Sequence, residues 1–97
     1  MSLIGKYVIV RTYSAGVFAG YLVSKDNKEV ELREARRLWS WAGAASLSQL
    51  AQDGTSAPEL CKFPVAVDQV MLTEVIEIDS VTNQAKESIA SVPVWSE

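Results

Sequence analysis

Two short segments of the chain combine residue types that bind anions and nucleotides. The first runs from Arg11 to Val17 and places an arginine, three hydroxyl side chains and a glycine around one expected turn. A guanidinium grips a phosphate with two parallel hydrogen bonds, and the backbone N–H groups of a small-residue turn can cradle an anion. The predicted ligand-binding turn consists of Arg11, Thr12, Tyr13, Ser14, Ala15, Gly16 and Val17. The alternative is a plain β-hairpin whose arginine is solvated.

The second segment holds two arginines followed closely by two tryptophans. Aromatic faces stack on nucleobases, and arginines contribute phosphate contacts and cation–π pairing. This grouping is what a nucleotide pocket requires, and it predicts ligand contacts from Arg36, Arg37, Trp39 and Trp41. The alternative is a pair of core tryptophans beside surface arginines.

The composition argues against catalysis and against a metal centre. The chain has no histidine, which removes the commonest general base and the commonest metal ligand. Its one cysteine, Cys61, excludes an internal disulfide and a multi-cysteine zinc site. We expect Cys61 to be a small buried hydrophobic residue in a reducing compartment. The sequence therefore predicts no enzymatic activity, no cofactor and no metal ion.

The chain has 97 residues, enough for one domain, and 48% of them are hydrophobic. Nine basic and 12 acidic residues give a formal charge of −3, which argues against binding to duplex nucleic acid. No apolar run approaches the ~20 residues that span a bilayer, and the N-terminus lacks a signal-peptide layout. We therefore expect a cytoplasmic protein with no membrane partner.

The elements that must position these residues form an α+β domain with a small antiparallel meander. Apolar alternation predicts strands over residues 6–13, 17–24, 29–33 and 70–78. The last of these is apolar on both faces, which is typical of a central strand or of one covered by another subunit. Residues 34–43 are predicted to be extended or irregular, because the Trp-x-Trp spacing is strand-like.

Two short helices are predicted over residues 46–53 and 82–91. Ser46 and Gln49 have the spacing of a capping box, and Gly54 stands where a helix stops. Ser80 or Thr82 is the expected cap of the second helix, an apolar stripe runs along it, and Pro93 ends it. We expect Trp95 to pack on the domain or on a second subunit. The apolar excess in the last strand and tail predicts a homo-oligomer.

Three segments, taken together and in order, resemble a family of small phage proteins. They read VIVRTYSAGVFAG over Val8–Gly20, EARRLWSWAGAASLSQLA over Glu34–Ala51 and LTEVIEI over Leu72–Ile78. The pattern resembles the Thoeris anti-defence signal sponges, specifically the first-described type, and the likeness extends from about Tyr7 to Trp95. The resemblance carries no residue-by-residue assignment of a binding site.

The resemblance implies that residues 1–97 form a single domain that binds a nucleotide signal without changing it. Members of the family sequester cyclic ADP-ribose isomers (glycocyclic ADP-ribose) made by bacterial TIR-domain proteins, so that the downstream NADase effector receives no signal. Some members also sequester cyclic trinucleotides of a second defence system at separate sites. The family forms homo-oligomers, hexamers built from dimers with ligands between subunits, and the implied location is the cytoplasm of the bacterial host.

Two hypotheses from other classes stay open on the sequence. A small oligomeric interaction module of phage origin would bind a protein or peptide, with Trp39, Trp41 and Trp95 as anchors. An enzyme would act on a nucleotide and release an altered product. The sponge agrees best with the composition, because capture needs arginine, hydroxyl and aromatic groups but neither a nucleophile nor a base.

Overall fold

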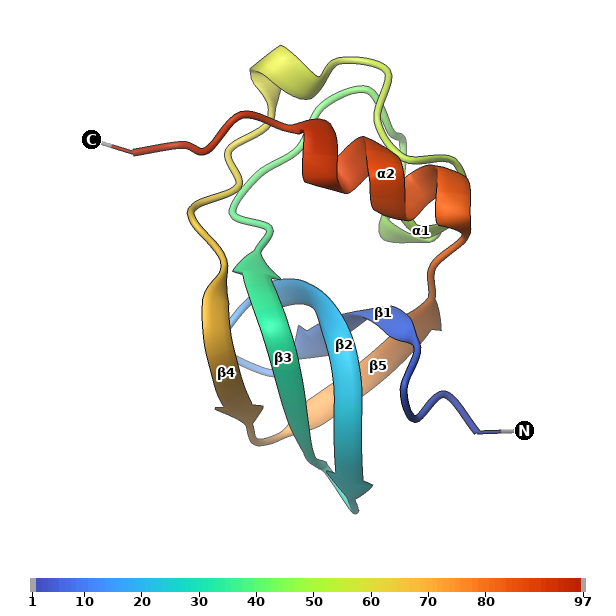
Figure 1. The fold of residues 1–97 in the computed structure, drawn as a ribbon, viewed down its shortest axis with the longest axis vertical. Helices are drawn as coiled ribbons and strands as arrows, with labels where there is room; N and C mark the ends of the chain where they lie inside the picture. The colour runs from blue at the N-terminus through green and yellow to red at the C-terminus, as the bar shows by residue number, and fades with distance from the viewer. Residues whose placement is uncertain (1, 97) are drawn as a thin grey trace.

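Five antiparallel strands form one sheet in the computed structural model, which describes residues 2–96 (Figure 1). The strands are β1 (Tyr7–Thr12), β2 (Val17–Asp26), β3 (Glu29–Arg37), β4 (Val67–Leu72) and β5 (Val75–Ser80). Their order across the sheet is β4-β3-β2-β1-β5. The predicted α+β class and the meander of the first three strands are therefore confirmed.

The two edge strands, β4 and β5, are consecutive in the sequence. The sheet curls strongly, because a short connection between them requires its two edges to come close together. Only Thr73 and Glu74 separate β4 from β5, and Glu74 takes a left-handed conformation with φ 57°. The prediction of one strand over residues 70–78 is therefore wrong, and so is the central-strand interpretation of its apolar faces: the segment divides into two edge strands. Apolar residues continue through a turn that holds neither glycine nor proline, so the pattern did not reveal the break.

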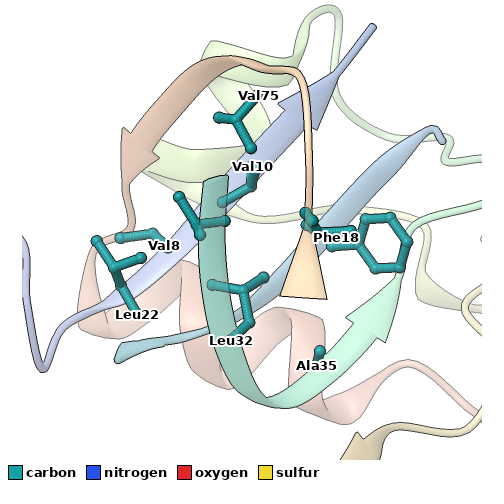
Figure 2. Packing of buried hydrophobic residues seen from close by; sticks show 9 residues of the cluster. Val8, Val10, Phe18, Leu22, Leu32, Ala35 and Val75 are labelled. Atoms are coloured by element: carbon teal, nitrogen blue, oxygen red, sulfur yellow. The ribbon is translucent and has the colours of Figure 1, made fainter. Parts of the chain in front are cut away.

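The inner side of the curl holds one hydrophobic core (Figure 2). Alternation along β1 places Val8 and Val10 on the same face, and both are fully buried. Burial of such a side chain contributes about 1.5–3 kcal/mol. The buried members of this core are Val8, Val10, Phe18, Leu22, Val30, Leu32, Ala35, Leu72 and Val75.

A second core lies on the outer face of the sheet, under α1 (Leu47–Asp53) and α2 (Asn83–Ser91). Between them the chain forms the short 3₁₀ helix η1 (Pro58–Leu60). Cys61 is 6% exposed, so its predicted role as a buried hydrophobic residue is confirmed. The buried members of this core are Ile9, Ala19, Leu38, Leu50, Ala51, Cys61, Phe63, Ile89 and Val92.

Both predicted helices are present: α1 begins at the expected cap, Ser46, and α2 begins at Thr82, one of its two expected caps. The Ser46 hydroxyl accepts a hydrogen bond from the Gln49 backbone N–H at 3.1 Å, and the Thr82 hydroxyl accepts one from the Ala85 N–H at 3.0 Å. Gly54 ends α1 with φ 79°. Within residues 2–96, no helix is long and apolar enough to cross a membrane.

β3 runs four residues beyond its predicted end at Arg33, and its last part contains a bulge. Glu34 has φ 51°, and the pairing of β2 with β3 shifts register there, opposite Gly20. A Cβ at Gly20 would lie 2.9 Å from the Arg33 carbonyl oxygen, so only glycine allows this approach. The bulge decides which face each residue after Glu34 occupies.

Candidate functional site

A hollow of about 300 Å³ lies where the turn between β1 and β2 meets the segment that follows β3. We call it the turn hollow. It brings together four residues of the predicted binding turn and three of the predicted Arg-Trp segment. The lining residues are Ser14, Ala15, Gly16, Val17, Arg37, Leu38, Trp39 and Trp41.

Thr12 shapes this turn from behind. Its hydroxyl donates to the Gly16 carbonyl oxygen at 2.9 Å and accepts from the Ala15 backbone N–H at 2.9 Å. The Thr12 N–H donates to the same carbonyl at 3.0 Å. Thr12 is 5% exposed and is not among the residues that line the hollow. It therefore positions the turn, whereas the sequence had predicted that it contacts the ligand.

Arg37 is held in place yet keeps most of its hydrogen-bonding capacity. Its guanidinium carbon lies 4.5 Å from the centre of the Phe18 ring, and its Nη1 donates to the Ala15 carbonyl oxygen at 2.7 Å. Among residues 2–96, Arg37 has no carboxylate partner. The other N–H groups of its guanidinium are therefore available to an anion in the turn hollow.

The two tryptophans differ in burial. Trp39 is 62% exposed, while its backbone N–H donates to the Lys62 carbonyl oxygen at 3.1 Å. Trp41 is half-buried and packs against the second core. The alternative of two core tryptophans therefore fails for Trp39, whose ring is an accessible stacking surface. Trp95 packs on its own domain, with the Lys62 ammonium 5.5 Å from its ring centre.

Arg36 points to the opposite face of β3 and lies outside the turn hollow, which corrects the prediction that it joins Arg37 there. Arg36 is 8% exposed, and its guanidinium donates to four backbone carbonyl oxygens. We call this arrangement the Arg36 anchor. The acceptors are Pro64 at 3.0 Å, Ile89 at 2.8 Å, Phe63 at 3.0 Å and Val92 at 2.7 Å.

The electrostatics of the anchor reflect its burial. Loss of solvent lowers the pKa of Arg36 from its ordinary value, and the nearby Tyr7 partly offsets this effect. Burial also raises the pKa of Tyr7 to about 12. Arg36 therefore fastens β3 to the end of α2 and to the Phe63–Pro64 segment, and these contacts use four of the five N–H donors of its guanidinium.

Arg11 and Tyr13 also lie outside the turn hollow. The Arg11 Nε is 3.6 Å from a carboxylate oxygen of Glu77, in a half-exposed ion pair. Burial, followed by the hydrogen bond and charge of Glu77, raises the pKa of Asp79 to about 6. Tyr13 is 77% exposed. Carboxylates thus already offset the charge of Arg11, in contrast to Arg37.

Two further hollows were not indicated by the sequence. One, of about 480 Å³, lies above the Arg36 anchor, where the Lys86 ammonium donates to the Tyr21 hydroxyl at 3.2 Å and Tyr7 lines the wall. Another, of about 560 Å³, lies beside the turn between β2 and β3. The first could have been anticipated only by knowing that α2 covers the outer face at Tyr7 and Tyr21. Within residues 2–96, no group of three or more Asp, Glu, Cys or His side chains is placed to hold a metal ion.

Comparison with known proteins gives one match. A protein-family model described as "Domain of unknown function (DUF6948)" matches residues 5–89 of the chain. Searches of the curated proteins and of the solved structures find no match.

Proposed function

We propose that this chain, which belongs to the DUF6948 family, is a non-catalytic sponge for cyclic ADP-ribose-type signals made by bacterial TIR proteins. The observation that carries the proposal is Arg37, a fixed guanidinium without a carboxylate partner in residues 2–96 that faces a small-residue turn and two tryptophans. The resemblance of three sequence segments to the Thoeris sponges names the ligand class. The turn hollow draws its lining from two of those segments.

The chemistry of the turn hollow suits such a ligand. A cyclic ADP-ribose isomer carries a diphosphate, an adenine and two riboses. Arg37 supplies charge-assisted donors for the diphosphate, and the exposed ring of Trp39 supplies a stacking surface for the adenine. The Ser14 hydroxyl can bond a ribose or a phosphate. None of these groups is a nucleophile with a neighbouring base, so the site captures the ligand and leaves it intact.

The size of the turn hollow gives a reason for assembly. At about 300 Å³ it stands at the lower limit of ligand pockets, which range over roughly 300–1,000 Å³. A dinucleotide-sized ligand therefore extends beyond it, and a second copy of the chain would cover the exposed part. The proposal includes a homo-oligomer for this reason, with the hexamer that the resemblance implies, in the cytoplasm of the bacterial host.

A protein-interaction module is the second candidate, and the 62% exposure of Trp39 is the observation that favours it. Exposed tryptophans are frequent anchors at protein interfaces. This candidate predicts that the chain captures no small molecule at all.

One experiment separates these functions. The protein is incubated with a cyclic ADP-ribose isomer, freed of unbound ligand by gel filtration and heated to denature it, and the released material is identified by mass spectrometry. Release of the intact isomer supports the sponge. An altered product indicates an enzyme, and no released ligand contradicts the sponge and leaves the interaction module.

A further inference from the structure

β4 is an edge strand with one side unoccupied. It pairs with β3, and in Figure 1 no other element among the described residues runs along its outer side. An edge strand presents unpaired backbone N–H and C=O groups, which form a template for another strand. Most natural edges are protected by lysine, proline or a bulge. The β4 sequence, VDQVML, has none of these residues and one charge, Asp68.

The outer face of β4 exposes two apolar side chains to solvent. Val67 is 47% exposed and Met71 is 58% exposed. Because side chains alternate along a strand, both point to the same face, on either side of Gln69. The Gln69 amide is fixed by its hydrogen bond to the Glu31 carboxylate at 2.7 Å. Two apolar side chains therefore flank one polar residue symmetrically on an unoccupied edge.

This symmetry is self-complementary. In an antiparallel pairing of two β4 strands about a two-fold axis at Gln69, each Val67 lies opposite the partner's Met71 on one face. Asp68 then lies opposite the partner's Val70, so that no like charges meet.

Neighbouring registers are worse. Moving the axis to Asp68 sets that carboxylate against the same carboxylate of the partner, a repulsive pair. Moving it to Val70 sets Asp68 against the partner's Leu72 and leaves Val67 without a partner inside the strand. Charge and apolar matching therefore select the register centred on Gln69.

The other edge of the sheet lacks this complementarity. β5 carries Glu77 and Asp79 on one face, and its pairing with β1 shifts register at Arg11. Two copies paired through β5 would bring these acidic groups together. The two edges therefore differ in their fitness for self-association, and β4 is the suitable one.

We propose that two copies of this chain associate through β4, edge to edge and antiparallel, with Gln69 on the two-fold axis. The sheets of the two copies then form one continuous sheet of ten strands, twice the five of one copy. This inference rests on the homo-oligomer of the proposed function and assigns it a surface.

A cysteine on the axis tests the register directly. In a Cys61→Ala background, Gln69→Cys places the two new thiols opposite each other, where paired Cβ atoms are about 4.5–5.5 Å apart. A short bis-maleimide spans that distance, and a disulfide, whose Cβ atoms lie about 3.5–4.5 Å apart, forms when the pair closes to the near end of the range. We expect mild oxidation or the bis-maleimide to give a covalent dimer on a non-reducing gel. Ile76→Cys, 51% exposed on β5, is the matched control and is expected to stay a monomer.

A second variant tests the apolar pairs without a cross-link. Val67→Lys with Met71→Lys places like charges opposite each other while changing only exposed side chains. By light scattering, we expect its mass to fall at least twofold below that of the parent, while its circular dichroism spectrum stays that of the folded parent. Ile76→Lys is expected to keep the parent's mass.

Two results would contradict the proposed interface. A monomeric parent, or cross-linking through Ile76→Cys instead of Gln69→Cys, would overturn the β4 interface. Calorimetry with a cyclic ADP-ribose isomer separates the two proposals. If the parent binds the isomer but Gln69→Cys does not cross-link, the β4 interface alone is overturned. If Gln69→Cys cross-links but the parent does not bind the isomer, the interface is supported and the proposed function is overturned.

Discussion

Arg36 and Arg37 are adjacent residues of the same type, and the structure gives them opposite tasks. The Arg36 guanidinium is buried and bonds four backbone carbonyl oxygens. The Arg37 guanidinium rests on Phe18, bonds one carbonyl and keeps its other donors. Burial and the number of satisfied donors, and not the residue type, therefore decide which arginine supports the fold and which can bind a ligand.

The two regions also depend on each other. The Arg36 anchor fixes the end of β3 to α2 and to the Phe63–Pro64 segment, directly behind the turn hollow. Arg37 is the next residue, so its position in the hollow is held by the anchor on the opposite face. A rigid support of this kind reduces the ordering that ligand binding has to impose.

The strongest test of this comparison is Arg36→Ala. We expect it to destabilise the protein by about 3–5 kcal/mol, because several buried carbonyl oxygens lose a charge-assisted donor at once. Chemical denaturation measures the effect. Arg33→Ala, which removes a partly exposed ion pair with Glu31 at 3.7 Å, is the control and should cost under about 1 kcal/mol. Equal stabilities of the two variants would refute the anchor.

Gly16→Ala affects the turn hollow through its backbone. Gly16 has φ 99°, a conformation that side-chain-bearing residues rarely adopt, and strain of this kind costs about 1–3 kcal/mol. We expect lower stability together with weaker binding of a cyclic ADP-ribose isomer. Gly5→Ala, at φ 84° and far from the hollow, should lower stability and leave affinity unchanged. A Gly16→Ala variant that binds the isomer with the parent's affinity would show that this turn is not part of the binding site.

Trp39→Ala sharpens the distinction between binding and support. Because the ring is 62% exposed, we expect little change in melting temperature. The loss of one base stack should weaken binding by about 1–3 kcal/mol, or roughly 5–150-fold. Trp41→Ala should lower both stability and affinity, since Trp41 also packs on the second core. A large stability loss in Trp39→Ala would instead identify that ring as core.

The anchor region should respond to alkaline pH through Tyr7. The pKa of Tyr7 is raised from 10.0 to about 12, so the folded state favours its neutral form. This contribution to stability is complete below pH 10 and is lost as the pH rises towards 12. Across that pH range, the free energy of unfolding measured by denaturation should therefore fall less steeply with pH for Tyr7→Phe than for the parent. Identical slopes would show that Tyr7 plays no part in the loss.

Much of the fold follows from local signals in the sequence. Alternation at Val30 and Leu32 predicts that both point into the core, and the cap signals at Ser46 and at Ser80 or Thr82 predict both helices. The break between β4 and β5 could not be predicted, because Thr73 and Glu74 are not typical turn residues and the apolar pattern runs through them. The two edge strands are consequently visible only in the structure.

The site was predicted in part: adjacent residues of a strand point to opposite faces, so Arg36 and Arg37 do not both line the turn hollow, and one bulge decides which of them does. Simple alternation from Leu32 would place Arg36 on the inner face of β3. The extra residue at Glu34 exchanges the two faces, so that Ala35 and Arg37 point inward and Arg36 points outward. No residue near Glu34 marks the bulge in isolation; its partner, Gly20, is 14 residues away in the sequence.

Calorimetric titration of a cyclic ADP-ribose isomer into the parent, Arg37→Ala and Arg33→Ala tests the central claim most directly. We expect Arg37→Ala to lose about 1.5–3 kcal/mol, roughly 10–150-fold in affinity, and Arg33→Ala to bind like the parent. Arg11→Ala belongs in the same series, because the sequence also placed Arg11 in the site. Parent-like binding by Arg37→Ala, with a loss in Arg11→Ala, would contradict the account and move the site to the β1–β5 edge.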